Sequence, residues 1–231
     1  MFIRDLDEMD NGRRKDSLLI GQPYESIFDG TGHLKWTALR DRPADTMYQS
    51  MQGEVFPFVK SLHTNNGSTY AKYMDDAIFK IPTPQLLEKI VTALDELYAL
   101  VEKSPDRKDV RGDLYEYMLS QLTTAGTNGQ FRTPRHIIRM MVELLDLKPT
   151  DTICDPACGT SGFLVSAGEY LKEKHLEEIF YNKDAKTHYD NTMFTGYDMD
   201  RTMLRIGAMN MMTHGIGNPH IVYSLNSLSQ N

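Results

Sequence analysis

Several features are scarce in this 231-residue sequence, and each scarcity excludes a class of protein. No apolar run is long enough to cross a membrane. Charged residues follow Met1 closely, at Arg4, Asp5 and Asp7, so the sequence predicts no signal peptide. Basic residues number 25 against 32 acidic ones, and the net charge of −7 makes the chain by itself an unpromising DNA binder. We therefore expect a cytoplasmic, soluble protein.

Cysteine is nearly absent, with only Cys154 and Cys158 in the whole chain. No second Cys or His pair lies near them, so they make a poor metal site, and no metal is predicted. We expect Cys154 to be a small buried residue of a strand and Cys158 to be a turn residue.

What the chain does contain is a run of small residues between a predicted strand and a predicted helix. Residues 155–164 read Asp-Pro-Ala-Cys-Gly-Thr-Ser-Gly-Phe-Leu, after a short buried strand predicted at 152–154. In α/β proteins, a strand, a small-residue turn and a helix present backbone N–H groups to a nucleotide-like ligand. The two glycines of the turn allow the ligand to approach closely, and Thr160 or Ser161 can cap the helix.

The details of this turn exclude the commoner glycine-rich motifs. No Lys follows the second glycine, which excludes a P-loop, and the third glycine of a dinucleotide-binding turn is missing. Asp155, at the end of the predicted strand, would repel phosphate but suits an ammonium group. This favours a cofactor such as S-adenosylmethionine, with an ordinary strand-to-helix turn as the alternative.

A second element lies upstream, where residues 129–135 read Gly-Gln-Phe-Arg-Thr-Pro-Arg. Thr133 is a good helix N-cap and Pro134 a good first helical residue. The helix predicted after them has an apolar stripe made of Ile137, Ile138, Met141, Val142, Leu144 and Leu145. The aromatic Phe131 beside the cap is the one hint of a role beyond starting a helix.

Together these two segments resemble the adenine-specific DNA methyltransferase subunit of type I restriction–modification systems. Its members carry Gly-Gln-Phe/Tyr-x-Thr-Pro, which folds over the cofactor, and then Asp-Pro-x-x-Gly-Thr-x-Gly-Phe-Leu, which cradles its methionine part. The similarity extends through residues 21–25, 112–119 and 196–200, so it covers nearly the whole chain. The resemblance implies an α plus α/β fold, in which a helical N-terminal region precedes an incomplete Rossmann-like S-adenosylmethionine-dependent methyltransferase domain.

The resemblance also implies a cofactor site. Asp155 would face the methionine ammonium, and Asp198, after the second predicted strand at 193–197, would accept hydrogen bonds from the ribose hydroxyls. The alternative for Asp198 is an acid stabilised by a helix dipole, which fits Asp200 better. Asn226 would lie near the adenine ring. The residues expected to bind the cofactor are Gln130, Phe131, Arg132, Thr133, Pro134, Arg135, Asp155, Gly159, Thr160, Ser161, Gly162, Asp198 and Asn226.

The base-binding motif of the family is expected beyond Asn231. This Asn-Pro-Pro-Phe/Tyr motif holds the flipped-out adenine, whereas the pair Asn218-Pro219 is followed by His220. We therefore expect an internal piece of a longer subunit that transfers a methyl group from S-adenosylmethionine to the amino group of adenine in DNA. No catalytic residue is predicted within these 231 residues, and the isolated chain is expected to be inactive.

The resemblance implies the specificity and restriction subunits of the same system as partners, with DNA contacted through the assembled complex and no membrane involved. Two other functions stay open. The first is a non-catalytic interaction module, in which the helical region docks to a specificity subunit and the cofactor pocket is vestigial. The second is a methyltransferase for another substrate, such as protein or RNA.

The chain divides into three predicted parts. Residues 1–104 form the helical N-terminal region, residues 105–112 a linker, and residues 113–231 the N-terminal part of the methyltransferase domain. In the first part, a long helix begins at Thr83-Pro84, and its apolar stripe comprises Leu86, Leu87, Ile90, Val91, Leu94, Leu97, Tyr98 and Val101.

Two further segments are predicted in the last part. Residues 181–191 are polar and predict an exposed loop. A methionine-rich helix follows the second strand and ends at Gly215, with core-facing residues Met203, Leu204, Ile206, Met209, Met211 and Met212.

Overall fold

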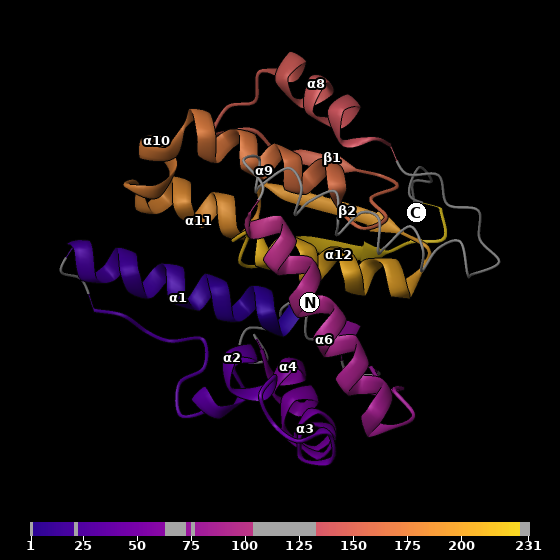
Figure 1. The fold of residues 1–231 in the computed structure, drawn as a ribbon. Coiled ribbons are helices and arrows are strands. Elements are labelled where there is room, and N and C mark those ends of the chain that lie inside the picture. The colour runs from indigo at the N-terminus through magenta and orange to yellow at the C-terminus, as the bar shows by residue number, and fades with distance from the viewer. Residues whose placement is uncertain (1, 21–22, 63–72, 75–76, 104–132, 227–231) are drawn as a thin grey trace.

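The computed structural model describes residues 2–20, 23–62, 73–74, 77–103 and 133–226 (Figure 1). Helices α1 to α6 form a helical part, and residues 133–226 form an α/β part that lies against α1. This arrangement confirms the predicted fold class. The predicted linker at 105–112 lies outside the described residues, so the predicted boundaries of the parts stay a prediction.

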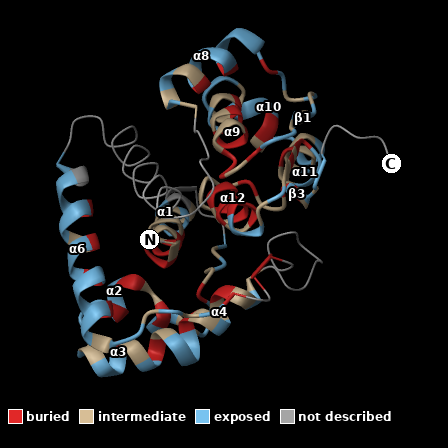
Figure 2. Ribbon diagram, turned by 90° about the vertical axis from the view of Figure 1, so that its right-hand side faces the viewer, coloured by how far each residue is buried: buried red, intermediate tan, exposed pale blue. Residues whose placement is uncertain are grey.

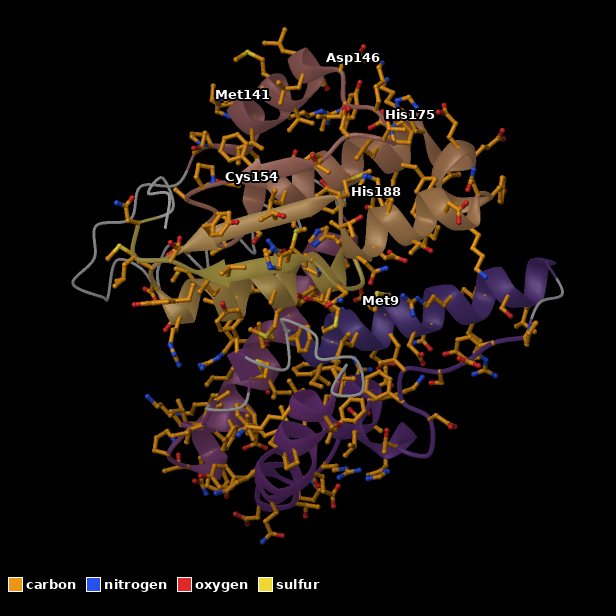
Figure 3. The ribbon with its side chains drawn as sticks, turned by 180° about the vertical axis from the view of Figure 1, so that it is seen from behind. Met9, Met141, Asp146, Cys154, His175 and His188 are labelled. Carbon is orange, nitrogen blue, oxygen red and sulfur yellow. The ribbon has the colours of Figure 1, made fainter. Side chains whose placement is uncertain are left out.

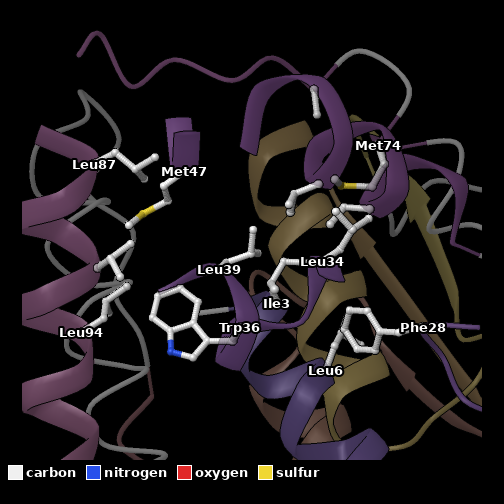
Figure 4. Close-up of a cluster of buried hydrophobic side chains, with 14 of the residues drawn as sticks. Ile3, Leu6, Phe28, Leu34, Trp36, Leu39, Met47, Met74, Leu87 and Leu94 are labelled. Atoms are coloured by element: carbon white, nitrogen blue, oxygen red, sulfur yellow. The ribbon is translucent and has the colours of Figure 1, made fainter. Parts of the chain in front are cut away.

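The helical part consists of short helices packed between two long ones. Its elements are α1 (Phe2–Ile20), a 3-10 turn (Gly32–Leu34), α2 (Trp36–Leu39), α3 (Ala44–Ser50), a π-helical turn (Met51–Val55), α4 (Phe56–Ser61) and α6 (Pro84–Glu102). Figure 4 shows the apolar centre of this part, where Trp36 and Leu39 lie between Leu87 and Leu94 of α6 on one side and Ile3 and Leu34 on the other. The predicted start of α6 at Thr83-Pro84 is confirmed, because the Leu86 N–H donates to the Thr83 hydroxyl.

Two buried carboxylates on α1 hold the loop that follows this helix. The Asp10 carboxylate accepts hydrogen bonds from the Ile27 N–H at 2.7 Å, the Ser26 hydroxyl at 2.9 Å and the Lys35 ammonium at 2.7 Å. One turn earlier, Asp7 accepts from the backbone N–H and the hydroxyl of Thr37. The loop is therefore attached to α1 by polar contacts inside the helical part.

The α/β part is a three-stranded parallel sheet with helices. In chain order its elements are α8 (Arg135–Leu145), β1 (Ile153–Asp155), α9 (Gly162–Lys174), α10 (Leu176–Phe180), α11 (Lys183–Asn191), β2 (Phe194–Asp198), α12 (Arg201–Thr213) and β3 (His220–Tyr223). The strand order is β1-β2-β3, with Ile153 opposite Phe194 and Gly196 opposite Ile221. The predicted methionine-rich helix is α12, and Gly215, with φ of +79°, follows its end as predicted.

The two faces of the sheet have different surroundings. Phe194, Gly196 and Ile221 share the face that packs against α9 and α12, and all three are buried. Cys154 points to the opposite face, which Figure 3 shows, and it is exposed. The prediction of a buried Cys154 was therefore wrong. The buried cysteine is Cys158, because its side chain fills the space above Gly196.

The prediction of an exposed loop at 181–191 was also wrong. Asn182 caps α11, since its side-chain oxygen accepts from the N–H groups of Asp184 and Ala185. Tyr189 lies fully buried between the rings of Phe180 and Phe194, at centroid distances of 5.5 and 5.2 Å. A single buried aromatic residue thus anchors a segment whose composition is otherwise polar.

The helical and α/β parts interlock through a few side chains. Ala208 and Met212 of α12 belong to the apolar core of the helical part. In the other direction, Tyr73 is buried in the core of the α/β part, and its phenol oxygen accepts a hydrogen bond from the Tyr223 N–H at the end of β3. Among the described residues, no helix is long and apolar enough to cross a membrane.

Candidate cofactor site

The carboxyl ends of β1 and β2 meet at one edge of the sheet, where Asp155 and Asp198 are the last strand residues. The small-residue turn that follows β1 is fixed to the end of β2. Its Cys158 N–H donates to the Tyr197 carbonyl at 2.8 Å, and its Gly159 N–H donates to Asp198 Oδ2 at 2.9 Å. The predicted strand-turn-helix segment and the second strand therefore form one site.

Asp198 connects three elements at this edge. Its Oδ1 accepts from the Asp200 N–H at 2.8 Å, and its backbone carbonyl accepts from the Ser224 N–H after β3. Asp200 is the N-cap of α12, and its side chain accepts from the Thr202 N–H at 2.7 Å. The prediction that Asp200 is the better helix-capping acid is confirmed. Asp198 does not cap the helix with its side chain but faces the turn, where it binds the Gly159 N–H.

Burial and a neighbouring acid set the charge of Asp155. Burial raises the pKa of its carboxyl, a hydrogen bond from the Ala157 N–H opposes the rise, and the negative charge of Asp198 adds to it. Burial, followed by the charges of Asp155 and Asp198, also raises the pKa of Cys158 to about 12. The raised pKa favours the neutral thiol of Cys158 near neutral pH, and the neutral thiol is a poor nucleophile.

The turn itself has an unusual backbone. Gly159 has a φ of +50° and Ser161 a φ of +63°, so two residues of the turn lie in the left-handed region. Ser161 is the N-cap residue of α9, but its hydroxyl makes no capping hydrogen bond, and its carbonyl accepts from the Val165 N–H instead. The prediction of a helix cap at Thr160 or Ser161 is confirmed for the position of Ser161, although its side chain is buried against α12 and forms no hydrogen bond with the helix N-terminus.

Gly207 and Asn210 of α12, which the sequence analysis did not single out, contact the turn. A Cβ on Gly207 would lie 2.6 Å from Ser161 Oγ and 3.1 Å from the Gly159 carbonyl oxygen, so the position accepts only glycine without displacement. The Asn210 side chain donates to the Thr160 carbonyl at 2.9 Å. The sequence signal for Asn210 was an amide side chain within an otherwise methionine-rich stripe. Among the described residues, no atom lies within 4 Å of a Cβ built on Gly159, which leaves space for a ligand.

The second predicted element is described only in part, since Gln130, Phe131 and Arg132 lie outside the described residues. The prediction of Thr133 as N-cap and Pro134 as first helical residue was wrong by one position. Pro134 has an extended ψ of 142°, and its carbonyl accepts from the N–H groups of Ile137 and Ile138, so Pro134 is the N-cap.

Helix α8, which begins at the end of the segment 129–135, packs against the start of α9. The Ile138 side chain contacts Gly162, where a Cβ would lie 3.5 Å from Ile138 Cδ1. Arg135 forms an ion pair at 3.8 Å with Glu169 of α9. Asn226 is exposed and follows β3 at the same edge of the sheet as Asp155 and Asp198.

A cavity of about 290 Å³ lies elsewhere, between α1, α11 and α12. Its lining includes Met9, Arg13, Lys186, Asp190 and Met212, and none of these belongs to the turn. Within the described part of the chain, no group of three or more His, Cys, Asp or Glu residues is arranged to hold a metal ion.

Comparison with known proteins identifies the family. The sequence profile of the family described as N-6 DNA Methylase matches residues 106–231. The chain belongs to the N-6 DNA methylase family. This finding confirms the resemblance inferred from residues 129–134 and 155–164.

Curated relatives include methylase subunits of type I restriction enzymes. The EcoEI methylase subunit of Escherichia coli is 29% identical over 193 residues, which cover 80% of this chain and 37% of that protein. The StySJI methylase subunit of Salmonella typhimurium is 27% identical over 202 residues, which cover 85% of this chain and 36% of that protein. The chain thus spans little more than a third of the length of the curated relatives it matches.

Solved structures agree on the fold. A modification subunit of a proposed type I restriction enzyme from Vibrio vulnificus YJ016 has a TM-score of 0.72 at 23% identity, with 99% of this chain and 49% of that chain covered. A chain from a study of complex assembly in the type I restriction–modification system has a TM-score of 0.58 at 25% identity, with 100% of this chain and 45% of that chain covered. Both matches include the helical part as well as the α/β part.

Proposed function

We propose that this chain supplies the S-adenosylmethionine site of an adenine-N6 DNA methyltransferase subunit in a type I restriction–modification system. The observation that carries the proposal is the pair of carboxylates, Asp155 and Asp198, on either side of a turn that is bonded to one of them through Gly159. Carboxylates suit the ammonium and ribose hydroxyl groups of this cofactor and would repel a nucleoside triphosphate. Family membership supports the same reading.

Each described residue has a proposed role. Asp155 faces the methionine ammonium, whose positive charge would favour the ionised carboxylate against its raised pKa. Asp198 bonds the ribose hydroxyls. Each of its oxygens accepts one backbone N–H and has a further acceptor site. The turn from Gly159 to Gly162 presents its backbone to the methionine carboxylate.

The remaining site residues are proposed from the family resemblance. Asn226 contacts the adenine edge, and residues 130–135, of which 133–135 are described, cover the cofactor from above. The bound cofactor would supply an electrophilic methyl group. Transfer by in-line displacement depends on positioning more than on acid or base catalysis, and no residue of this chain is assigned to hold the target adenine. We therefore propose that methylation needs more than these 231 residues.

The proposed partners are the specificity and restriction subunits of the same system. The net charge of −7 supports an arrangement in which other subunits share the contact with DNA phosphates. The curated relatives are named as subunits of type I restriction enzymes, which also supports this assignment.

Titration calorimetry of the chain with S-adenosylmethionine, and with its demethylated product, tests the site. The Asp198→Ala variant should lose about 1.5–3 kcal/mol of binding free energy, or about 10–150-fold in affinity, because a charged hydrogen-bond acceptor disappears. Asp200→Ala is the matched control. It removes a helix cap, should lower the unfolding free energy by about 0.5–2 kcal/mol, and should leave affinity unchanged.

Three outcomes would count against the proposal. Equal affinity of the Asp198→Ala variant and the natural chain would reject the ribose role. A folded chain without affinity for either compound would favour an interaction module with a vestigial pocket. Methyl transfer by this chain to protein or RNA, but not to unmethylated DNA in the presence of a specificity subunit, would favour the alternative substrates.

A further inference from the structure

One short segment of the helical part is buried in both cores of the molecule. Tyr73 and Met74 are neighbours in the sequence, and both side chains are buried. Tyr73 belongs to the apolar core of the α/β part, whereas Met74 belongs to the core of the helical part, where Figure 4 shows it. Two successive residues therefore attach one part of the molecule to the other.

Helix α12 holds the backbone of the same segment. This helix lies at the centre of the molecule, between α1 and the sheet, and it is largely buried (Figure 2). Its Arg205 donates a hydrogen bond from Nε to the Tyr73 carbonyl at 2.8 Å. Residues of the α/β part thus contact both the side chain and the backbone of Tyr73, and these contacts fix the position of its phenol group.

The phenol group of Tyr73 meets the outer side of β3. Within the described part of the chain, β3 is an edge strand, because it pairs only with β2. The Ser224 N–H points to β2 and donates to the Asp198 carbonyl at 2.9 Å. Successive N–H groups of a strand point to opposite sides, so the Tyr223 N–H points outward, where it donates to the Tyr73 phenol oxygen at 2.7 Å. Tyr73 therefore supplies the acceptor that a further strand would supply.

The residue bonded to Tyr73 lies beside the candidate cofactor site. In the register of the sheet, Tyr223 is opposite Asp198, and the chain continues directly into residues 224–226. These residues include Asn226, the proposed contact to the adenine edge. Next to the buried ring of Tyr73, an N–H without an acceptor would cost free energy, and the end of β3 would have to move to find one. The hydrogen bond to Tyr73 thus fixes the place where the chain leaves the sheet.

We propose that Tyr73 is a positioning residue for adenine recognition, because it holds the end of β3 and so places residues 224–226 beside the adenine of the cofactor. The helical part then contributes to the cofactor site without contacting the reacting methyl group. This inference rests on the proposed function, since it requires S-adenosylmethionine to bind at the edge formed by Asp155 and Asp198.

Titration calorimetry with two compounds tests this role. S-adenosylhomocysteine contains adenine, whereas its inosine analogue has an oxygen in place of the exocyclic amino group. We expect the natural chain to prefer the adenine compound. The Tyr73→Phe variant should bind S-adenosylhomocysteine on the order of tenfold more weakly, but should lose no more than about threefold in affinity for the inosine analogue. The preference should narrow because the contact to the amino group is the one that depends on residues 224–226.

Tyr189→Phe is the matched control. Tyr189 is a buried tyrosine of the same core, and its hydroxyl donates to the Gly168 carbonyl of α9 at 3.2 Å. The control loses one phenol hydrogen bond, as Tyr73→Phe does, but should keep the natural affinity for both compounds. The proposal would be overturned if Tyr73→Phe bound both compounds as the natural chain does, or if it lost the same affinity for both.

Hydrogen exchange of the natural chain provides a measurement that needs no variant. Binding of S-adenosylhomocysteine should slow exchange of the Tyr223 and Ser224 amides, and the inosine analogue should slow it less. Unchanged exchange at these amides on binding would also overturn the proposal. A natural chain with affinity for neither compound would reject the proposed function and this inference with it, whereas a natural chain that binds both, with an unaltered preference in Tyr73→Phe, would reject only the role of Tyr73.

Discussion

The helical part and the α/β part each use an aspartate to hold a loop, but the two aspartates differ in burial. Asp10 has no solvent-exposed surface and accepts hydrogen bonds from Ser26, Ile27 and Lys35. Asp198 is half-buried at an edge of the sheet and accepts from two backbone N–H groups. An acid enclosed by its own partners stabilises the fold, whereas an acid that holds a turn at an open edge is also placed to bind a ligand.

The same comparison separates the pKa values of the two parts. Burial opposes ionisation of Asp10, but hydrogen bonds from Lys35, Tyr24, Ile27 and Ser26 outweigh it and lower the pKa of its carboxyl. In the candidate cofactor site, burial raises the pKa of Asp155. In the helical part, Asp10 is therefore paired with the positive charge of Lys35. The candidate cofactor site instead places two negative charges, those of Asp155 and Asp198, close to one another.

The largest effect is expected where the buried carboxylate of the helical part is removed. Asp10→Ala removes the acceptor of the Ile27 N–H and the nearer carboxylate of the Lys35 ammonium, which keeps only Asp7 at 3.8 Å, and this should cost about 3–5 kcal/mol of unfolding free energy. Urea denaturation measures it. The control Asp41→Ala removes an acid whose side chain is 79% exposed and should change the unfolding free energy by less than about 0.5 kcal/mol. Equal effects of the two variants would show that the Asp10 cluster does not stabilise the helical part.

A smaller effect is expected from overpacking below the turn. In Gly207→Ala the new methyl group would press on Ser161 and Gly159, with about 1–3 kcal/mol of strain partly offset by about 1 kcal/mol of helix propensity. Gly168→Ala in α9 is the matched control, because its Cβ would lie 2.8 Å from Ile216 Cδ1, in the core and away from the turn.

Both glycine variants should therefore be similarly destabilised in urea. Only Gly207→Ala should weaken S-adenosylmethionine binding, on the order of tenfold, because it displaces the turn. If both variants bound the cofactor as the natural chain does, the support of the turn by α12 would be irrelevant to binding.

The smallest effect is a difference between the pH values at which the aspartates of the two parts take up a proton. Because the folded-state pKa of Asp10 is lowered, its contribution to stability is present above the unfolded value of about 3.9 and is lost as pH falls through the lower folded value. Because the pKa of Asp155 is raised, this residue takes up its proton at a higher pH than Asp10 does.

On acidification, cofactor affinity should therefore fall before the helical part unfolds. Calorimetry at decreasing pH, together with circular dichroism of the same samples, measures the order of the two events. Unfolding of the helical part at a higher pH than the loss of affinity would contradict the assignment of the two acids.

The sequence by itself determined the local elements and the family. Preferences for turns, helix caps and strand ends act over a few residues, so the sequence shows them directly. They predicted the small-residue turn at 155–164, the cap and proline at the start of α6, and the position of Asp198 at the end of β2. The motifs at 129–134 and 155–164 were enough for the family, because each depends on residue type and order rather than on distant contacts.

Only the tertiary structure decided which of these residues are buried and what they contact. Helical spacing placed Leu86 and Leu87 in one stripe, yet Leu87 is buried and Leu86 is exposed, since the neighbours that cover α6 come from α3, far away in the sequence. The Gly159 to Asp198 hydrogen bond and the place of Gly207 below the turn likewise join segments 39 or more residues apart. Burial depends on such distant segments meeting in space, and local sequence preferences carry no record of which segments those are.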